Sequence, residues 1–264
     1  MTTTRRDLVA AAAVAASIAS AAQAQPAGPA PRTAPARNIV LVHGAFADGS
    51  GWRGVHADLT ARGYRVSIVQ NPLTSLADDV AATRRVLARQ DGPTILVGHS
   101  YGGTVITEAG NDPKVVGLVY VAAFAPDAGQ STGEQLAVIP PPPEFVIEPQ
   151  ADGFGFLNLD RFKAGFAADL SDADAAFLRD SQVPIAMSAF GERVSQAAWR
   201  SRPSWAVVPA QDRAIDPRLL HQTARRIGAE TLELQGSHVV FIAQPRPVAD
   251  VIDRAARGLR RAAE

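Results

Sequence analysis

The fold of this chain is decided by the stretch ILVGHSYGG at residues 95–103. Three apolar residues of strand character lead into residues 98–102, which match the pattern G-x-S-x-G around Ser100, and a helix-like segment follows from residue 104. A serine on so tight a turn sits in strained backbone, and the flanking glycines let neighbouring backbone approach closely. The first free N–H groups of the new helix point at the same place. The stretch therefore predicts that Ser100 is a nucleophile on a strand–turn–helix motif, a nucleophile elbow.

Strand-like and helix-like segments alternate on both sides of this motif. Apolar runs typical of strands lie at residues 38–42, 64–69, 95–97, 115–124, 205–208 and 231–234. Helix-like segments lie at residues 53–62, 76–90, 104–109, 218–227 and 246–260. Continuous apolar runs are typical of parallel strands that are covered on both faces, and this alternation favours a parallel sheet with right-handed crossovers. We expect an α/β fold with a mostly parallel central sheet flanked by helices.

The alternation stops between residues 127 and 203. This segment contains four consecutive prolines, residues 140–143, together with scattered aromatics and short helical patterns. A structureless loop of this length inside a compact domain is unusual. We therefore predict a core made of residues 38–126 and 204–264, with residues 127–203 inserted as a helical cap over the carboxyl ends of the strands.

The composition of the first 37 residues is typical of an export signal followed by a linker. Arg5 and Arg6 precede an Ala/Val run, and residues 22–24 (AQA) fit a small-x-small cleavage site. Residues 1–24 therefore resemble a twin-arginine export signal, and the Pro/Ala-rich residues 25–37 are typical of a flexible linker. The alternative is a disordered Ala-rich leader. We expect a periplasmic or secreted protein whose mature form does not insert into a membrane.

Composition excludes several classes of site. The 264 residues include 26 basic and 26 acidic side chains, so the formal net charge is zero and no basic patch for nucleic acid is indicated. The chain has no cysteine, which excludes a thiolate nucleophile, a zinc–thiolate site and disulfide bonds. An apolar content of 47% is enough for a large core.

A serine nucleophile needs a base and a group that orients the base. His238 lies in a loop just after the last predicted strand, at the edge of the sheet where sites in open α/β folds form. Asp212 directly follows the preceding strand, 26 residues before His238, and Asp216 is the competing carboxylate. The order Ser, Asp, His is the order found in α/β-hydrolases. We predict a triad of Ser100, Asp212 and His238.

The developing oxyanion needs fixed N–H donors. The N–H of Tyr101 follows the nucleophile at the start of a helix, and the N–H of Ala45 lies in the glycine-rich loop after the first strand. His43 and His99 together suggest a metal site, but they lack a carboxylate at ligand spacing. We prefer a loop-shaping hydrogen bond for His43, and we expect neither metal nor cofactor.

Four separated segments make the chain resemble the α/β-hydrolase superfamily: residues 41–46 (LVHGAF), 97–103 (VGHSYGG), 211–215 (QDRAI) and 236–241 (GSHVVF). Within it, the chain is similar to small serine carboxylesterases related to plant methylesterases, hydroxynitrile lyases and bacterial pyrethroid-hydrolase-like esterases. The resemblance implies the same triad and the same oxyanion donors. Hydroxynitrile lyases of this group carry a lysine after the catalytic histidine, whereas this chain has Val239.

An apolar acyl pocket is expected beside the serine. His43, Phe46 and Phe124 are the candidate pocket residues, and the alternative for each is an ordinary core position. Further aromatic candidates are Tyr101, Phe145, Phe154, Phe156, Phe162, Phe166 and Phe190.

We therefore expect a serine carboxylesterase that acts on small to medium uncharged esters, as a monomer or homodimer, with a small-molecule ester as its partner and no nucleic acid. The alternatives are hydroxynitrile-lyase-like chemistry, cofactor-free perhydrolase or haloperoxidase chemistry on the same triad, and a non-catalytic small-molecule binder.

Overall fold

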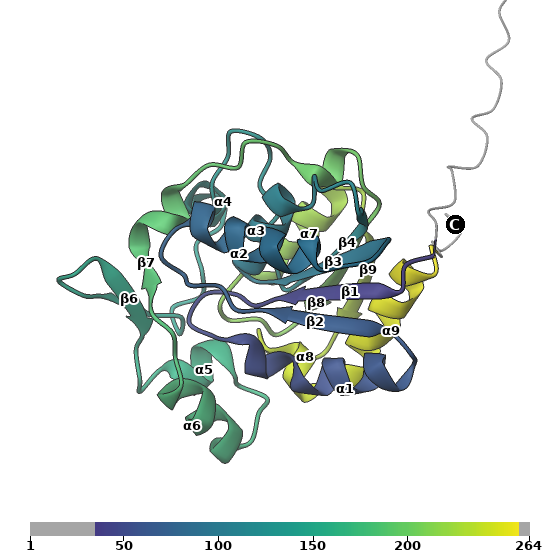
Figure 1. Cartoon of the computed structure of the whole chain (residues 1–264). Helices are drawn as coiled ribbons and strands as arrows, with labels where there is room; N and C mark the ends of the chain where they lie inside the picture. Colours follow the sequence, from purple (N-terminus) through teal and green to yellow (C-terminus); the bar gives the residue numbers. More distant parts are fainter. Residues whose placement is uncertain (1–34, 259–264) are drawn as a thin grey trace, which may run out of the picture. The chain divides into compact units, whose positions relative to one another are not determined.

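The computed structural model describes residues 35–258, and its centre is a six-stranded sheet (Figure 1). All the pairings in this sheet are parallel, and the strand order is β2-β1-β3-β4-β8-β9. The strands are β1 (Asn38–Val42), β2 (Arg65–Val69), β3 (Thr94–His99), β4 (Val115–Val121), β8 (Ser204–Pro209) and β9 (Glu230–Leu234). Every residue of β1, β3 and β8 is buried, because helices cover both faces. The predicted parallel sheet is confirmed.

Helices form one layer on each face of this sheet. Figure 1 shows α1, α8 and α9 on one face and α2, α3 and α7 on the other. Their bounds are α1 (Arg53–Ala61), α2 (Leu76–Ala88), α3 (Gly102–Ala109), α7 (Pro217–Arg226), α8 (Val240–Ala243) and α9 (Pro245–Ala256), and the 3₁₀ helix η1 (Gly49–Trp52) precedes α1. No helix among residues 35–258 is long and apolar enough to cross a membrane.

Helix α2 illustrates how local sequence sets an element. The hydroxyl of Ser75 accepts a hydrogen bond from the N–H of Asp78 and so caps the first turn. Leu76, Val80 and Leu87 are spaced for one face of a helix, and all three are buried. The cap therefore sets where α2 begins, and the apolar face sets which side packs on the sheet.

The insertion differs in part from the prediction. Residues 127–203 do contain helices, but they also contain a three-stranded antiparallel sheet in the order β5-β6-β7, so the expected helical cap is a mixed one. Figure 1 shows this segment beyond the carboxyl ends of the central strands. Its elements are α4 (Thr132–Val138), β5 (Ile147–Pro149), β6 (Phe154–Leu157), α5 (Phe162–Phe166), α6 (Asp172–Asp180), β7 (Ile185–Ala186), η2 (Met187–Gly191) and η3 (Ala198–Arg200).

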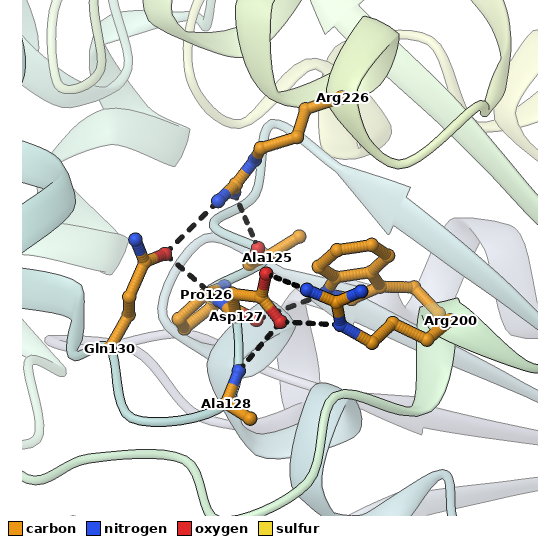
Figure 2. Close-up of polar contacts among 8 residues, drawn as sticks. Ala125, Pro126, Asp127, Ala128, Gln130, Arg200 and Arg226 are labelled. Carbon is orange, nitrogen blue, oxygen red and sulfur yellow. Dashed lines mark hydrogen bonds and ion pairs between the residues drawn. The ribbon is translucent and has the colours of Figure 1, made fainter.

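The two ends of the insertion are joined at its base (Figure 2). The guanidinium of Arg200 donates from Nε to Asp127 Oδ1 over 2.7 Å, and its Nη2 pairs with the second carboxylate oxygen. The indole N–H of Trp199 donates to the carbonyl oxygen of Pro126 over 3.0 Å. Residues near the two ends of the insertion therefore hold each other in place.

Arg226, the last residue of α7, ties this base to the core (Figure 2). Its guanidinium donates to the carbonyl oxygen of Ala125 over 2.7 Å and to the side-chain oxygen of Gln130 over 3.0 Å. The same group lies 5.7 Å from the ring centroid of Trp199. Partial burial lowers its pKa, although it remains a cation at any ordinary pH.

Strand β4 ends at Val121, three residues earlier than the sequence suggests, because Ala122 turns the chain with a φ of +46°. The export signal predicted for residues 1–24, and all but the last three residues of the linker predicted for residues 25–37, lie outside the described residues.

Helix α3 begins against the end of strand β4, and this contact leaves no room for a side chain at Gly103. A Cβ atom there would lie 2.1 Å from the carbonyl oxygen of Phe124, which is backbone and cannot rotate away. We predict that Gly103→Ala lowers the free energy of unfolding by about 1–3 kcal/mol or more, as measured by urea denaturation.

Gly191→Ala is the matched control, because a Cβ atom at Gly191 meets nothing within 4 Å. Equal stability of the two variants would show that α3 does not depend on this close contact.

Candidate active site

Ser100 sits at the turn between β3 and α3 with a φ of +53°, in the left-handed region that non-glycine residues rarely adopt. Its N–H donates to the carbonyl oxygen of Val121 over 3.2 Å, and the residue is 8% exposed. The strand–turn–helix setting predicted for the motif is therefore present. Because of this strained turn, the serine lies outside both the strand and the helix.

The loop after β1 lies directly against Ser100. A Cβ atom at Gly44 would come within 2.7 Å of Ser100 Cβ and 3.0 Å of the His99 carbonyl oxygen. Only glycine fits so close an approach. The peptide group that joins Gly44 to Ala45 is thereby placed beside the serine.

The orientation of this peptide group is fixed by His43. The backbone N–H of Asn71 donates to His43 Nε2 over 2.9 Å, so the proton of the neutral ring resides on Nδ1. His43 Nδ1 then donates to the carbonyl oxygen of Gly44 over 2.9 Å. In a trans peptide the N–H points opposite to the C=O. Holding the Gly44 carbonyl therefore also aims the N–H of Ala45.

The peptide group between Ser100 and Tyr101 is fixed in the same way. The Ser100 carbonyl oxygen accepts from the N–H of Gly103 over 2.9 Å and from the N–H of Phe124 over 3.2 Å. Within residues 35–258, neither the N–H of Ala45 nor that of Tyr101 donates to a protein acceptor. Two N–H groups with fixed orientation and no protein acceptor in this range therefore lie beside Ser100. Such a pair of donors is suited to stabilise an oxyanion.

Asp212 and His238 meet at the carboxyl edge of the sheet. Asp212 follows β8, His238 follows β9, and His238 Nδ1 lies 2.7 Å from Asp212 Oδ2 with both residues buried. The other carboxylate oxygen accepts from the N–H groups of Ala214 (2.8 Å) and Ile215 (2.9 Å). Because a carboxylate only accepts, Nδ1 carries the proton and Nε2 keeps its lone pair when the ring is neutral.

Two further residues hold the loop that carries His238. His99 Nε2 donates to the His238 carbonyl oxygen over 3.1 Å, and the two rings lie 4.6 Å apart. Asp169, from the insertion, accepts the N–H of Ser237 over 2.9 Å and also its hydroxyl. The insertion therefore takes part in positioning this loop.

Among the described residues, no hydrogen bond joins the hydroxyl of Ser100 to the ring of His238. His99 links the two residues: it directly precedes Ser100 in the chain, and its ring contacts both the ring and the carbonyl oxygen of His238. Catalytic hydrogen bonds of this kind are often long without substrate and tighten when it binds.

The three candidate pocket residues are placed differently. His43 and Phe46 line a narrow, mostly apolar cavity together with His99, Phe166 and Phe241. The ring of Phe124 instead packs in a separate cluster, and that cluster contains Val208, Ile215, Leu219 and Leu220.

Aromatic residues of the insertion pack on the loop that follows β1. Phe145 and Phe190 each lie 6.3 Å from Phe46 between ring centroids, and Phe190 lies 5.7 Å from Tyr101. Phe46 and Tyr101, which flank the two peptide groups beside Ser100, therefore belong to one aromatic cluster with these rings of the insertion.

The competing titratable residues lie elsewhere. Asp216 caps α7 by accepting the N–H of Arg218 over 2.8 Å, and its carboxylate pairs with the Arg218 side chain. His221 pairs with Glu233 on strand β9 over 2.7 Å. Neither residue contacts the carboxylate–histidine pair of Asp212 and His238.

Burial keeps two histidines of the site neutral. It lowers the pKa of His43, and it lowers the pKa of the completely buried His99 well below the ordinary value, with a smaller contribution from the charge of His238. Neither ring is available as a cation at neutral pH.

Sequence reasoning missed three polar residues that hold the loops of this site: Asn71, Asp79 and Asp169. Asn71 and Asp169 leave no sequence signal, since each makes contacts far from its own segment. Asp79 does leave one, because it lies three residues after Leu76, on the apolar face of α2. A carboxylate on an apolar face is the signal that would have found it.

The sequence of this chain is similar to those of known hydrolases. The model of the alpha/beta hydrolase family matches residues 39–251. A carbendazim hydrolyzing esterase from Nocardioides sp. (strain SG-4G) is 39% identical over 140 residues, which cover 47% of this chain and 56% of that protein. A pyrethroid hydrolase from Sphingobium wenxiniae is 34% identical over 158 residues, covering 50% and 55%. The chain thus matches about half the length of these two relatives.

The crystal structure of a pyrethroid hydrolase from Sphingobium faniae JZ-2 has the same fold. It superposes with a TM-score of 0.71 at 21% identity and covers 84% of this chain and 97% of that one.

The neutral state of His99 predicts a pH dependence of stability. Its pKa is lower in the folded than in the unfolded chain, so only the unfolded chain gains a proton as the pH falls below about 6.5. The contribution of His99 to the free energy of unfolding is therefore fully present above about pH 6.5. Below that pH it falls, by at most about 1.4 kcal/mol per pH unit. In His99→Gln, whose amide can still donate to His238, we expect the free energy of unfolding to fall less steeply between pH 6.5 and 4.5.

Urea denaturation across this pH range checks the prediction, and His56→Gln on α1 gives the baseline for removing a histidine. Parallel curves for wild type and His99→Gln would contradict it.

Proposed function

The chain belongs to the alpha/beta hydrolase family, and on this basis we propose that it is a serine carboxylesterase that hydrolyses small to medium uncharged esters through an acyl-enzyme on Ser100. The observation that carries the proposal is the buried hydrogen bond of 2.7 Å between Asp212 and His238, at the edge of the sheet where Ser100 follows β3. Two relatives that are named as an esterase and a pyrethroid hydrolase support the reaction class.

In the proposed acylation, Ser100 Oγ attacks the ester carbonyl carbon while His238 Nε2 takes the hydroxyl proton. The carbonyl oxygen becomes an oxyanion, which the N–H groups of Ala45 and Tyr101 stabilise. Asp212 stays ionised and stabilises the imidazolium. When the tetrahedral intermediate collapses, the C–O bond to the alcohol breaks and the alcohol leaves with the proton from His238.

Deacylation repeats these steps with water as the nucleophile. His238 Nε2 takes a proton from water, and the hydroxide adds to the acyl carbon within the same pair of N–H donors. Collapse then breaks the bond to Ser100 Oγ, which recovers its proton from His238, and the carboxylic acid is released. The enzyme returns to its starting state without any cofactor in these steps.

The surroundings of Ser100 favour uncharged substrates. Phe145 and Phe190 each pack on Phe46 in the loop that carries the N–H of Ala45, and apolar walls of this kind disfavour a charged acyl group. Val239, which follows His238, is 2% exposed and brings no cation to the site. An ester is therefore a better fit than a cyanohydrin.

Hydrolysis of a series of short p-nitrophenyl esters tests the proposal. We predict that Ser100→Ala lowers kcat on the order of 10⁶-fold, because the attacking oxygen is removed. Ser201→Ala, on a serine that follows η3 and lies outside the site, is the matched control and should retain wild-type activity. Unchanged hydrolysis by Ser100→Ala would refute the serine mechanism, and inactivity of the folded wild type on every ester would refute the esterase assignment.

The role of Asp212 has its own test. Asp212→Asn should lower kcat on the order of 10⁴-fold, because an amide does not hold the tautomer in which Nδ1 carries the proton. The control is Asp216→Asn, since asparagine caps a helix about as well as aspartate, and its activity should stay at the wild-type level. A larger loss in Asp216→Asn than in Asp212→Asn would contradict this role and assign it to Asp216.

A further inference from the structure

Asp79 makes two hydrogen bonds that connect separate parts of the site. It lies on α2 and is completely buried. Its Oδ1 accepts the backbone N–H of Leu73 over 2.8 Å, and its Oδ2 accepts the hydroxyl of Tyr101 over 3.0 Å. One carboxylate thus holds the loop between β2 and α2 and also the residue that follows Ser100.

The same loop reaches the other half of the oxyanion site. The side-chain amide of Asn71 donates to the carbonyl oxygen of His43 over 2.9 Å, and its backbone N–H donates to the His43 ring. That ring holds the carbonyl of Gly44 and so orients the N–H of Ala45. Asp79 is therefore connected to both N–H donors, to one through Tyr101 and to the other through Leu73, Asn71 and His43.

Leu73 shows why the loop needs an anchor. Its φ of +58° lies in the left-handed region, which costs free energy for a branched side chain. The loop stays in this conformation because Asp79 holds the N–H of Leu73 and the N–H of Ala186 in the insertion donates to the Leu73 carbonyl over 2.8 Å. Without the carboxylate, the strained residue would relax and Asn71 would move with it.

Burying this carboxylate carries a cost that an apolar residue would avoid. Burial is the main reason why the pKa of Asp79 is raised to about 6; the hydrogen bonds from Leu73 and Tyr101 oppose this rise, and the charges of Asp78 and Glu192 add to it by less. Above that pH the group is an anion that only accepts, which matches the two donors it receives. A costly polar group that is fully satisfied at a site is typical of a functional constraint.

We propose that Asp79 is a positioning residue for the oxyanion hole, which sets the mutual orientation of the N–H groups of Ala45 and Tyr101 without touching the substrate. This inference rests on the proposed esterase function. The proposed site then contains two carboxylates with different roles. Asp79 positions the N–H groups that stabilise the charge on the carbonyl oxygen, whereas Asp212 orients His238 for proton transfer.

The test is steady-state hydrolysis of a p-nitrophenyl ester at pH 8 by Asp79→Ala and Asp79→Asn. In Asp79→Ala both donors lose their acceptor, and we predict a fall in kcat of about 10- to 100-fold, part of the loss seen when a whole oxyanion donor is removed. Because misplaced oxyanion donors affect the transition state more than the bound ester, KM should change by less than about twofold.

Asp79→Asn is the conservative rescue. Its amide oxygen can accept from Leu73 and its amide N–H can donate to the Tyr101 oxygen, so kcat should stay within about threefold of the wild type. Asp78→Ala is the matched control, because Asp78 is the neighbouring carboxylate on the same helix, is exposed, and accepts side-chain hydrogen bonds from Thr74 and Ser75 at the surface. Its kcat should equal that of the wild type.

A double-mutant cycle separates this role from simple destabilisation. Tyr101→Phe removes one arm of the network but keeps the backbone N–H, and Asp79→Ala should cost less kcat in that background than in the wild type. Asp79→Asn and Tyr101→Phe also keep the test decisive if Asp79→Ala does not fold, as judged by urea denaturation.

The outcomes distinguish the two proposals. Wild-type kcat in a folded Asp79→Ala, a loss confined to KM, or additive losses with Tyr101→Phe would overturn the positioning role and leave the esterase standing. An inactive, folded wild type would overturn the esterase itself.

Discussion

The site depends on the left-handed backbone of Ser100. At a φ of +53° the chain reverses between β3 and α3, so that the serine leaves the sheet while its carbonyl oxygen is held by two N–H groups. The next N–H, that of Tyr101, must then face away from those bonds, because the peptide is planar and trans. The loop after β1 meets this turn only because Gly44 has no side chain to collide with Ser100. One strained residue thus positions the proposed nucleophile and one of the proposed donors.

The loops around this turn are held by polar side chains that do not belong to the proposed triad. Asp79 holds the loop before α2, Asp169 holds the loop of His238, and His99 bonds to the carbonyl of His238. Asp169 comes from the insertion, and Glu192 of the insertion accepts the N–H of Leu76 over 3.1 Å. The insertion therefore does more than cover the carboxyl edge of the sheet, since it is bonded to the segments that carry the site.

The sequence was most informative where structure is local. Apolar runs and turn residues predicted the central strands and helices, and the nucleophile motif with the order of Asp212 and His238 led to the carboxylate–histidine pair that the structure brings together. The strands of the insertion were missed because they contain only two to four residues, too few for a period to appear. Asn71 and Asp169 were missed because their partners lie 28 and 68 residues away in the chain. Such contacts follow from the fold and leave no local pattern.

The central claim is that ester hydrolysis proceeds through Ser100, and labelling with an active-site fluorophosphonate tests it most directly. We expect that one label binds per chain, that peptide mass spectrometry places it on Ser100, and that esterase activity disappears in proportion to labelling. In the proposed mechanism, His238 and the two N–H donors assist the attack on phosphorus in the same way as the attack on a carbonyl carbon. Full esterase activity in a completely labelled protein, or a stoichiometric label on a different residue, would contradict the account.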